Sequence, residues 1–185
     1  NYFDINDVYS FGGFNSVFGC HADRLKVPGI EVSTGSLGHG IAVSVGMALA
    51  EKTRNSSRRV ISLIGDGESN EGSVWEAFMV AADQKLDNLT VIFDANQSQS
   101  KCLQIHNPGE RLRAFGFDVV ELDGHDIKAL CAALTSPVKT GTPRAIIANT
   151  KKGYGCATMV DNMHEWHRSS PDAKTLELFL GELDA

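Results

Sequence analysis

Short apolar runs alternate with helix-like segments along this chain, and this alternation limits its fold more than any other feature. Residues 59–64 and 89–93 are apolar runs of strand length, and residues 72–85 between them carry apolar side chains at helical spacing. A strand, a helix and a second strand in this order form a βαβ unit with parallel strands. The sequence therefore predicts an α/β fold, a parallel sheet with helices on both faces.

The same pattern continues on both sides of this unit. Residues 37–54 are rich in Ala, Val, Met and Leu with interspersed small residues, which predicts a buried helix packed closely against a neighbour. Further along, we expect a short helix, a strand, a helix and a strand at 111–115, 118–122, 126–134 and 143–148. No repeat or low-complexity linker interrupts the pattern, so we expect residues 1–185 to form one domain.

Two segments lack this regularity. Residues 1–36 contain glycines and a Pro-Gly pair, and they predict a short helical turn followed by a long irregular loop. Residues 151–171 follow the last predicted strand and also have loop character, before a final helix at about 172–180.

Composition argues against several classes of protein. A formal net charge of −6 and a pI near 5.5 disfavour nucleic-acid binding, which depends on clustered Lys and Arg. Glycines, serines or charges interrupt the apolar stretches well before the ~20 residues of a membrane span. The four cysteines form no C-x-x-C pair, and the first residues do not resemble a secretion signal. We therefore expect a reduced, cytoplasmic protein that binds neither nucleic acid nor membrane.

Polar side chains follow two of the predicted strands. Asp66, flanked by glycines, comes directly after the strand at 59–64, and Asn96 follows the strand at 89–93. If these strands are neighbours, both side chains lie at one edge of the sheet. Their oxygens suit Mg²⁺ or Ca²⁺, whose coordination a diphosphate and water would complete. The helix beginning near Gly72 would direct its N-terminus toward that anion.

Other interpretations of this pattern compete with a ligand site. Gly-Asp-Gly alone is more often a simple tight turn, and only its combination with a helix, a second strand and Asn96 favours a ligand site. A dinucleotide-binding fold fits less well, because no G-x-G-x-x-G follows a predicted strand. A G-x-x-x-x-G-K-[ST] loop for a nucleoside triphosphate is also absent from the sequence.

The motif Gly65-Asp66-Gly67, followed at a fixed interval by Asn96, resembles the signature of thiamine-diphosphate enzymes. The longer segments 65–76, GDGESNEGSVWE, and 31–40, EVSTGSLGHG, are similar to transketolase, particularly its split bacterial form. In that form an N-terminal subunit carries the diphosphate-binding domain, and a separate C-terminal subunit carries the pyrimidine-binding domain. The resemblance extends over most of the chain.

The resemblance implies thiamine diphosphate as cofactor and a divalent metal, Mg²⁺, with Ca²⁺ or Mn²⁺ as alternatives. Asp66 and Asn96 would bind the metal through side-chain oxygens, and Ser98 through its backbone carbonyl. The amide of Gly67 would contact the diphosphate.

The same resemblance implies that residues 151–171 form an active-site loop, and it implies roles for residues in both irregular segments. The backbone at Gly35 and Leu37 would contact the aminopyrimidine ring. His21 and His167 are similar to active-site histidines that bind donor hydroxyls or move protons, and His167 would also contact the cofactor. Arg168 stands where relatives often have glycine, which leaves the alignment of this last motif open.

Glu71 and Glu76 resemble acidic residues that link the two active sites of transketolase across its dimer interface. An ordinary helix N-terminus is an equally good interpretation, because the helix dipole favours carboxylates there.

The function implied by the resemblance is transfer of a two-carbon ketol unit from a ketose phosphate to an aldose phosphate. We expect the chain to act only with a pyrimidine-domain subunit, in a dimer of heterodimers, because the activating glutamate belongs to that subunit. Two alternatives stay open. One is another thiamine-diphosphate reaction, either deoxyxylulose-phosphate synthesis or 2-oxo acid decarboxylation. The other is a non-catalytic scaffold, suggested because the Ser-Lys-Gly-His motif of the family does not occur in these residues.

Overall fold

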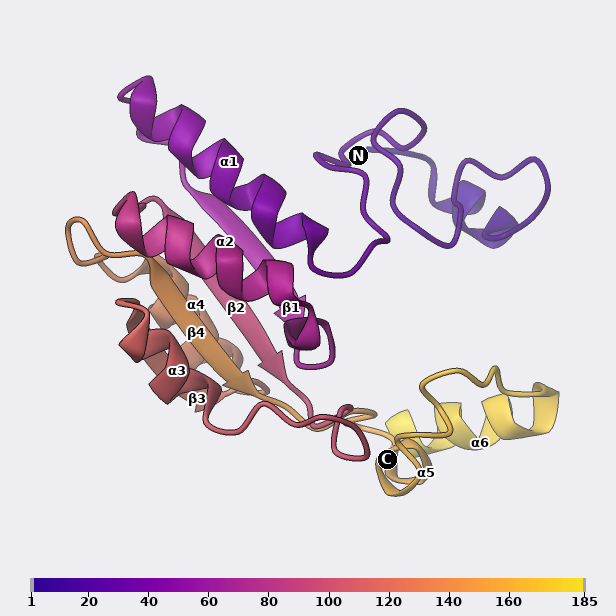
Figure 1. Ribbon diagram of the computed structural model, residues 1–185. Coiled ribbons are helices and arrows are strands. Elements are labelled where there is room, and N and C mark those ends of the chain that lie inside the picture. Colours follow the sequence, from indigo (N-terminus) through magenta and orange to yellow (C-terminus); the bar gives the residue numbers. More distant parts are fainter. Residues whose placement is uncertain (1, 185) are drawn as a thin grey trace.

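The sheet is parallel and lies at the centre of the fold (Figure 1). A computed structural model describes residues 2–184, so the outermost residues of the predicted domain, 1 and 185, lie outside it. Within the described residues the strands are β1 (Val60–Gly65), β2 (Leu89–Ala95), β3 (Asp118–Asp123) and β4 (Arg144–Asn149). Their spatial order is β1-β2-β4-β3, and every neighbouring pair is parallel. The predicted α/β fold with a parallel sheet is confirmed.

Helices lie on both faces of the sheet, as predicted (Figure 1). The helices α1 (His39–Thr53), α2 (Gly72–Asp83) and α3 (Pro108–Ala114) share one face, and α4 (Ile127–Thr135) lies on the other. This division follows from the strand order. The chain moves in one direction from β1 to β2 and on to β3, then returns to β4. Right-handed crossovers therefore place α2 and α3 on the face opposite α4.

The main core lies between the sheet and the α1–α2 layer. Its largest fully buried side chains include Ile41, Val74, Phe78, Ile64, Val91 and Phe93. Phe78 also packs edge-on against Trp75 and Phe117, at ring-centroid distances of 5.6 and 5.4 Å. Truncating a buried phenylalanine to alanine typically costs about 3–5 kcal/mol, so this layer dominates the stability of the fold.

The helix α1 is less buried than its sequence predicted. Ile41, Val45 and Ala48 face the core, whereas Val43 and Met47 on the other side are 43% and 38% exposed. The small residues of this helix are not required by packing within the described chain, because an added Cβ at its glycines would meet no atom within 4 Å. The helix is therefore buried on one side only, and its exposed side is also apolar.

Helix cover on the second face is incomplete. The alternate side chains of β1 point to the α4 side of the sheet, where Ile61 is 53% exposed and Leu63 is 69% exposed. Contacts of α4 with the sheet are concentrated on β3, at the opposite edge. The apolar outer face of β1 is therefore open in the described part of the chain.

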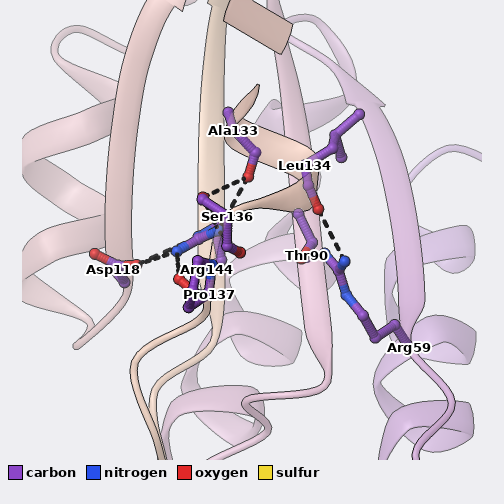
Figure 2. A network of polar contacts seen from close by, with 8 residues as sticks. All are labelled: Arg59, Thr90, Asp118, Ala133, Leu134, Ser136, Pro137 and Arg144. Carbon is purple, nitrogen blue, oxygen red and sulfur yellow. Dashed lines mark hydrogen bonds and ion pairs between the residues drawn. The ribbon is translucent and has the colours of Figure 1, made fainter. Parts of the chain in front are cut away.

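A buried arginine joins α4 to the sheet (Figure 2). Arg144, the first residue of β4, is only 4% exposed, and its guanidinium donates to the carbonyls of Ala133, Ser136 and Pro137 at 2.6–3.0 Å. The same group pairs with Asp118 at the start of β3, with 3.1 Å between Nη2 and Oδ2. Carbonyls at a helix end lack intrahelical partners. At the end of α4 Arg144 donates to the carbonyl of Ala133, and Arg59 donates to that of Leu134 over 2.8 Å.

The remaining elements show where the predictions were imprecise. The predicted helical turn near the N-terminus is η1 (Ile5–Ser10), and the final helix is α6 (Ala173–Leu183). The helix expected at 111–115 begins earlier, at Pro108, since proline is favoured in the first turn. Residues 151–171 contain a short helix, α5 (Ala157–Asp161), which the prediction of a loop missed. No helix in residues 2–184 is long and apolar enough to cross a membrane.

Candidate functional site

The two polar loops singled out in the sequence leave the same edge of the sheet. β1 and β2 are neighbours, with Gly65 opposite Asp94 in the parallel register. The backbone amide of Asp66 then donates to the carbonyl oxygen of Asp94 over 3.1 Å. The expectation that these strands lie side by side is confirmed, and it brings the loop after Asp66 against the loop that contains Asn96.

Asp66 is the buried acidic group of this edge, with 3% of its surface exposed. Its Oδ1 accepts hydrogen bonds from the amide of Gly67 over 2.7 Å and from the hydroxyl of Ser98 over 2.6 Å. The next residues form the 3-10 helix η2 (Glu68–Asn70), and the side chain of Ser69 donates to the carbonyl of Asp66. The carboxylate is therefore held in one orientation by both loops.

The loop after β2 folds back toward Asp66 through a tight turn. The Oδ1 of Asn96 accepts from the amide of Ser98 over 2.9 Å, and Gln97 between them has a φ of +63°. Asn96 also donates through Nδ2 to Asp94 over 2.6 Å, and Asp94 accepts from the hydroxyl of Thr150 as well. Asp94 thus orients Asn96 and ties the end of β2 to the residue that follows β4.

The donor chemistry of this edge fits a hard divalent cation. Asp66 contributes a carboxylate and Asn96 an amide oxygen, the oxygen ligands that Mg²⁺ and Ca²⁺ prefer. Between residues 2 and 184, no group of three or more His, Cys, Asp or Glu side chains is placed to hold a metal. A site here therefore relies on amide and backbone oxygens beside one carboxylate. Ser98 contacts Asp66 through its hydroxyl, and its role as a ligand through the backbone carbonyl stays a prediction.

A cavity of about 640 Å³ opens at this edge. Five of the predicted site residues line it: Leu37, Gly67, Asn96, Ser98 and His167. The side chains of Lys152, His164 and Arg168 from the loop after β4 line the same cavity. Asp66 instead contacts a smaller cavity of about 250 Å³. Segments that are far apart in the sequence therefore line one cavity. Asp66 lies outside its lining.

His21 and Gly35 lie together, outside the lining of that cavity. Gly35 has a φ of +148°, and a Cβ added to it would lie 2.9 Å from Cδ2 of the His21 imidazole. The amide of Thr34 donates to the carbonyl of Ala22 over 3.1 Å, which holds the two segments side by side. The structure thus groups these predicted residues with each other and not with His167.

Glu71 and Glu76 are exposed at the beginning of α2. Glu71 stands at the N-cap position, but its side chain makes no capping hydrogen bond. A Cβ added to Gly38 would lie 2.8 Å from Cβ of Glu71, so the segment before α1 runs directly past this helix start.

Glu68 is a site residue that the sequence-based prediction missed. Its Oε1 accepts from the amide of Gly38 over 2.9 Å, and its Oε2 accepts from the amide of Gly65 over 3.4 Å. This carboxylate joins the segment before α1 to the loop after β1. Its position directly after Gly67 was a usable signal, because a carboxylate next to a glycine-rich turn lies close to free amides.

His164 and His167 both line the cavity, but their surroundings differ. The Nε2 of His164 lies 3.2 Å from the hydroxyl of Ser100. The cation of Lys152 lowers the pKa of His167 below its ordinary value of 6.5, and partial burial, Arg168 and His164 lower it further. The negative charge of Asp66 opposes this shift. The His167 imidazole is therefore neutral at neutral pH, at a cationic edge of an otherwise acidic protein.

Comparison with known proteins identifies the family. A family model described as the thiamine diphosphate binding domain of transketolase matches residues 2–179. The chain belongs to the transketolase family.

Relatives and solved structures agree with this assignment. An apulose-4-phosphate transketolase subunit from Actinobacillus succinogenes is 42% identical over 168 residues, which are 88% of this chain and 60% of the relative. The 6-deoxy-6-sulfo-D-fructose transketolase subunit SqwG from a Clostridium species is 37% identical over 162 residues, 84% of this chain and 59% of the relative.

The crystal structure of transketolase from Campylobacter jejuni superimposes with a TM-score of 0.76 at 26% identity. The match covers 97% of this chain and 33% of that transketolase. The chain therefore has the fold of one part of a transketolase, and it spans about 60% of the length of the Actinobacillus relative.

Proposed function

We propose that this chain is the diphosphate-binding subunit of a split transketolase, which transfers a two-carbon ketol unit from a ketose phosphate to an aldose phosphate. The observation that carries the proposal is the convergence of Asp66, Asn96 and Ser98 at the wall of a cavity that also contains His167. Membership of the transketolase family supports it, as do the names of two relatives, both transketolase subunits.

Thiamine diphosphate and Mg²⁺, or Ca²⁺ or Mn²⁺ in its place, are the groups this site would hold. When bound, thiamine diphosphate supplies the carbanion chemistry for breaking and forming the carbon–carbon bond. Asp66 and Asn96 would bind the metal through their side-chain oxygens, and Ser98 through its carbonyl. The amide of Gly67 would donate to the diphosphate.

The segment before α1 would receive the other end of the cofactor. The backbone at Gly35 and Leu37 would contact the aminopyrimidine, and a glycine suits this role because a side chain at position 35 meets the ring of His21. Glu68 would hold this segment in place through its bond to Gly38.

Two histidines would handle protons and hydroxyl groups of the sugar. A neutral imidazole accepts a proton from a hydroxyl and returns it later, and the lowered pKa keeps His167 in that form at neutral pH. His21, exposed beside Gly35, would bind a donor hydroxyl from the opposite segment. Each histidine thus approaches the substrate from a different part of the chain.

A second protein with the pyrimidine-binding domain would complete the enzyme, in a dimer of heterodimers. The relatives named as subunits support a split enzyme. Glu71 and Glu76 are exposed at the start of α2 and would meet the corresponding residues of a second copy across the interface. All four cysteines are free thiols, which supports a reduced, cytoplasmic location.

The alternatives gain no support from these observations. The deoxyxylulose-phosphate and 2-oxo acid reactions would use the same metal site, but the relatives named above are transketolases. A scaffold that binds no cofactor does not need the ordered bonds among Asp66, Asn96 and Ser98. An assay of the chain with its partner, using ketose phosphates and 2-oxo acids as donors, separates the transketolase reaction from the two alternative reactions.

The metal assignment is tested by calorimetric titration with thiamine diphosphate and Mg²⁺, with and without the partner subunit. We expect Asp66→Ala to abolish metal-dependent binding. Asp66→Asn should weaken binding at least tenfold, because it retains an oxygen for Gly67 and Ser98 but lacks the charge. Asp83→Ala, at the far end of α2, is the matched control and should bind normally. Wild-type affinity in Asp66→Ala would refute the site, and no binding by the wild-type protein in either state would favour a scaffold.

A further inference from the structure

We infer that His125 positions the loop 151–171, by accepting a hydrogen bond from the first amide of that loop and by stacking on Tyr154. The amide of Lys151 donates to Nε2 of His125 over 2.8 Å. The rings of His125 and Tyr154 lie 3.7 Å apart between centroids, with an angle of 14° between their planes. His125 contacts neither the metal site nor the cavity, so its role is to position other residues. The inference rests on the proposed function for what the loop does.

The backbone before His125 explains why the imidazole reaches the loop. The amide of Gly124 donates to the carbonyl of Asn149 over 2.8 Å, which extends the contact between β3 and β4 beyond the end of the strands. A Cβ on Gly124 would overlap the side chain of Thr150, so only glycine allows this approach. The amide of His125 then donates to Oδ1 of Asp123 over 2.9 Å. These bonds fix the turn at residues 123–125. The imidazole of His125 therefore lies against the start of the loop 151–171.

The two contacts of His125 act on adjacent parts of the loop. The hydrogen bond holds Lys151, which precedes the cavity-lining residue Lys152. Stacking holds Tyr154, whose side chain is otherwise 63% exposed. A hydrogen bond and an aromatic stack each lower the equilibrium constant for opening of the segment by about fivefold. Together they restrain the segment 151–154 by about 25-fold.

This restraint bears on the site because the same loop carries four cavity-lining residues, Lys152, His164, His167 and Arg168. Lys152 lies close enough to His167 to lower the pKa of that imidazole. The loop has another anchor before it, the bond from Thr150 to Asp94, and one further along, between His164 and Ser100. Between these two anchors His125 restrains residues 151–154, and Glu182 of α6 accepts hydrogen bonds from Cys156 and Thr158 further along.

Three substitutions separate the two contacts. His125→Phe retains a ring for stacking but has no acceptor, and His125→Gln retains an acceptor near the position of Nε2 but no aromatic ring. His125→Ala loses both. Lys128→Ala is the control, because Lys128 is exposed on the neighbouring helix α4.

The first measurement is hydrogen exchange of the amides in segment 151–154, in the protein with its partner subunit. We expect exchange about fivefold faster in His125→Phe and His125→Gln, about 25-fold faster in His125→Ala, and unchanged in the control. The exchange of β1 amides should stay at the wild-type rate. Unchanged exchange at Lys151 in His125→Ala would overturn the inference, as would equal acceleration throughout the sheet, which would indicate a general loss of stability.

The second measurement links the restraint to function. In steady-state kinetics we expect His125→Ala to raise the KM for thiamine diphosphate with a smaller change in kcat, and His125→Gln to recover part of the loss. An unchanged KM together with faster exchange would overturn the link between His125 and the site. Failure of the proposed function is a different result, in which the wild-type protein does not bind the cofactor while the exchange rates still change.

Discussion

Replacement of Arg144 by methionine tests the network that fastens α4 to the sheet (Figure 2). Methionine matches the apolar stem of arginine but has no donor, so Arg144→Met removes the hydrogen bonds and the charge while retaining the packing of the stem. The buried carbonyl of Ala133 keeps only the hydroxyl of Ser136 as a donor, and Asp118 loses its ion-pair partner.

The loss in the free energy of unfolding depends on whether water can reach the groups that bonded to Arg144. Breaking a buried ion pair usually costs about 3–5 kcal/mol, because the remaining charge stays buried. Here the side chain of Asp118 is 33% exposed, and Ser136 and Pro137 are exposed as well, so water replaces some of the lost bonds. We therefore expect the lower end, a loss of about 3 kcal/mol in the free energy of unfolding.

Urea denaturation followed by far-UV circular dichroism measures this loss as a shift of the midpoint at constant slope. Thermal unfolding should show a decrease of about 6–12 °C for a chain of this length. The control is Arg113→Met. Arg113 pairs with Glu121 over 2.8 Å, but the two side chains are 49% and 45% exposed. That variant should lose less than about 1 kcal/mol. If both variants lose the same small amount, the network does not stabilise the fold as argued.

Three further outcomes follow from the described contacts. The pKa of Glu182 is lowered, mainly by its hydrogen bond from Cys156, so its stabilising effect is complete above the unfolded value of 4.5 and disappears as pH falls through the lower folded pKa. Glu182→Gln should remove this acid-side dependence in a pH series of melting temperatures. The cation of Lys152 lowers the pKa of His167, and a bound anion would raise it again. Cofactor binding below about pH 6.5 should therefore take up protons, measurable by calorimetry in buffers with different ionisation enthalpies. Gly35→Ala would place a Cβ 2.9 Å from a neighbouring imidazole at a φ of +148°, so cofactor affinity should fall while the melting temperature changes little.

The strands and the helices packed on them could be predicted, because the pattern of their apolar side chains follows the pattern of burial. The apolar runs at 59–64 and 89–93 became β1 and β2, and the stripe at 72–85 became α2. Helix α5 has no buried residue and therefore no apolar stripe to detect. It is held from outside, where Glu182 of α6 accepts from the hydroxyl and the amide of Thr158. A contact between two segments of this kind leaves no periodic signal in either one.

In the candidate site, too, some features could be predicted from the sequence and others depend on contacts between distant segments. Asp66 and Asn96 could be assigned to one edge from the order of strands and helix alone. The contact of the Ser98 hydroxyl with Asp66 depends on the turn at Gln97, whose positive φ no residue type dictates. The bridge from Glu68 to Gly38 depends on how the segment before α1 passes the loop after β1.

By itself, the sequence determined that strands and helices alternate, that the strands are parallel, and that polar side chains follow β1 and β2, because apolar periodicity and turn chemistry are local properties. Only the tertiary structure decided that β4, and not β3, lies beside β2. Sequence order does not reveal this, because parallel neighbours joined by right-handed crossovers are possible in either arrangement. The choice places Thr150 against Asp94, and it thereby brings the loop 151–171, with His167, to the cavity beside Asn96.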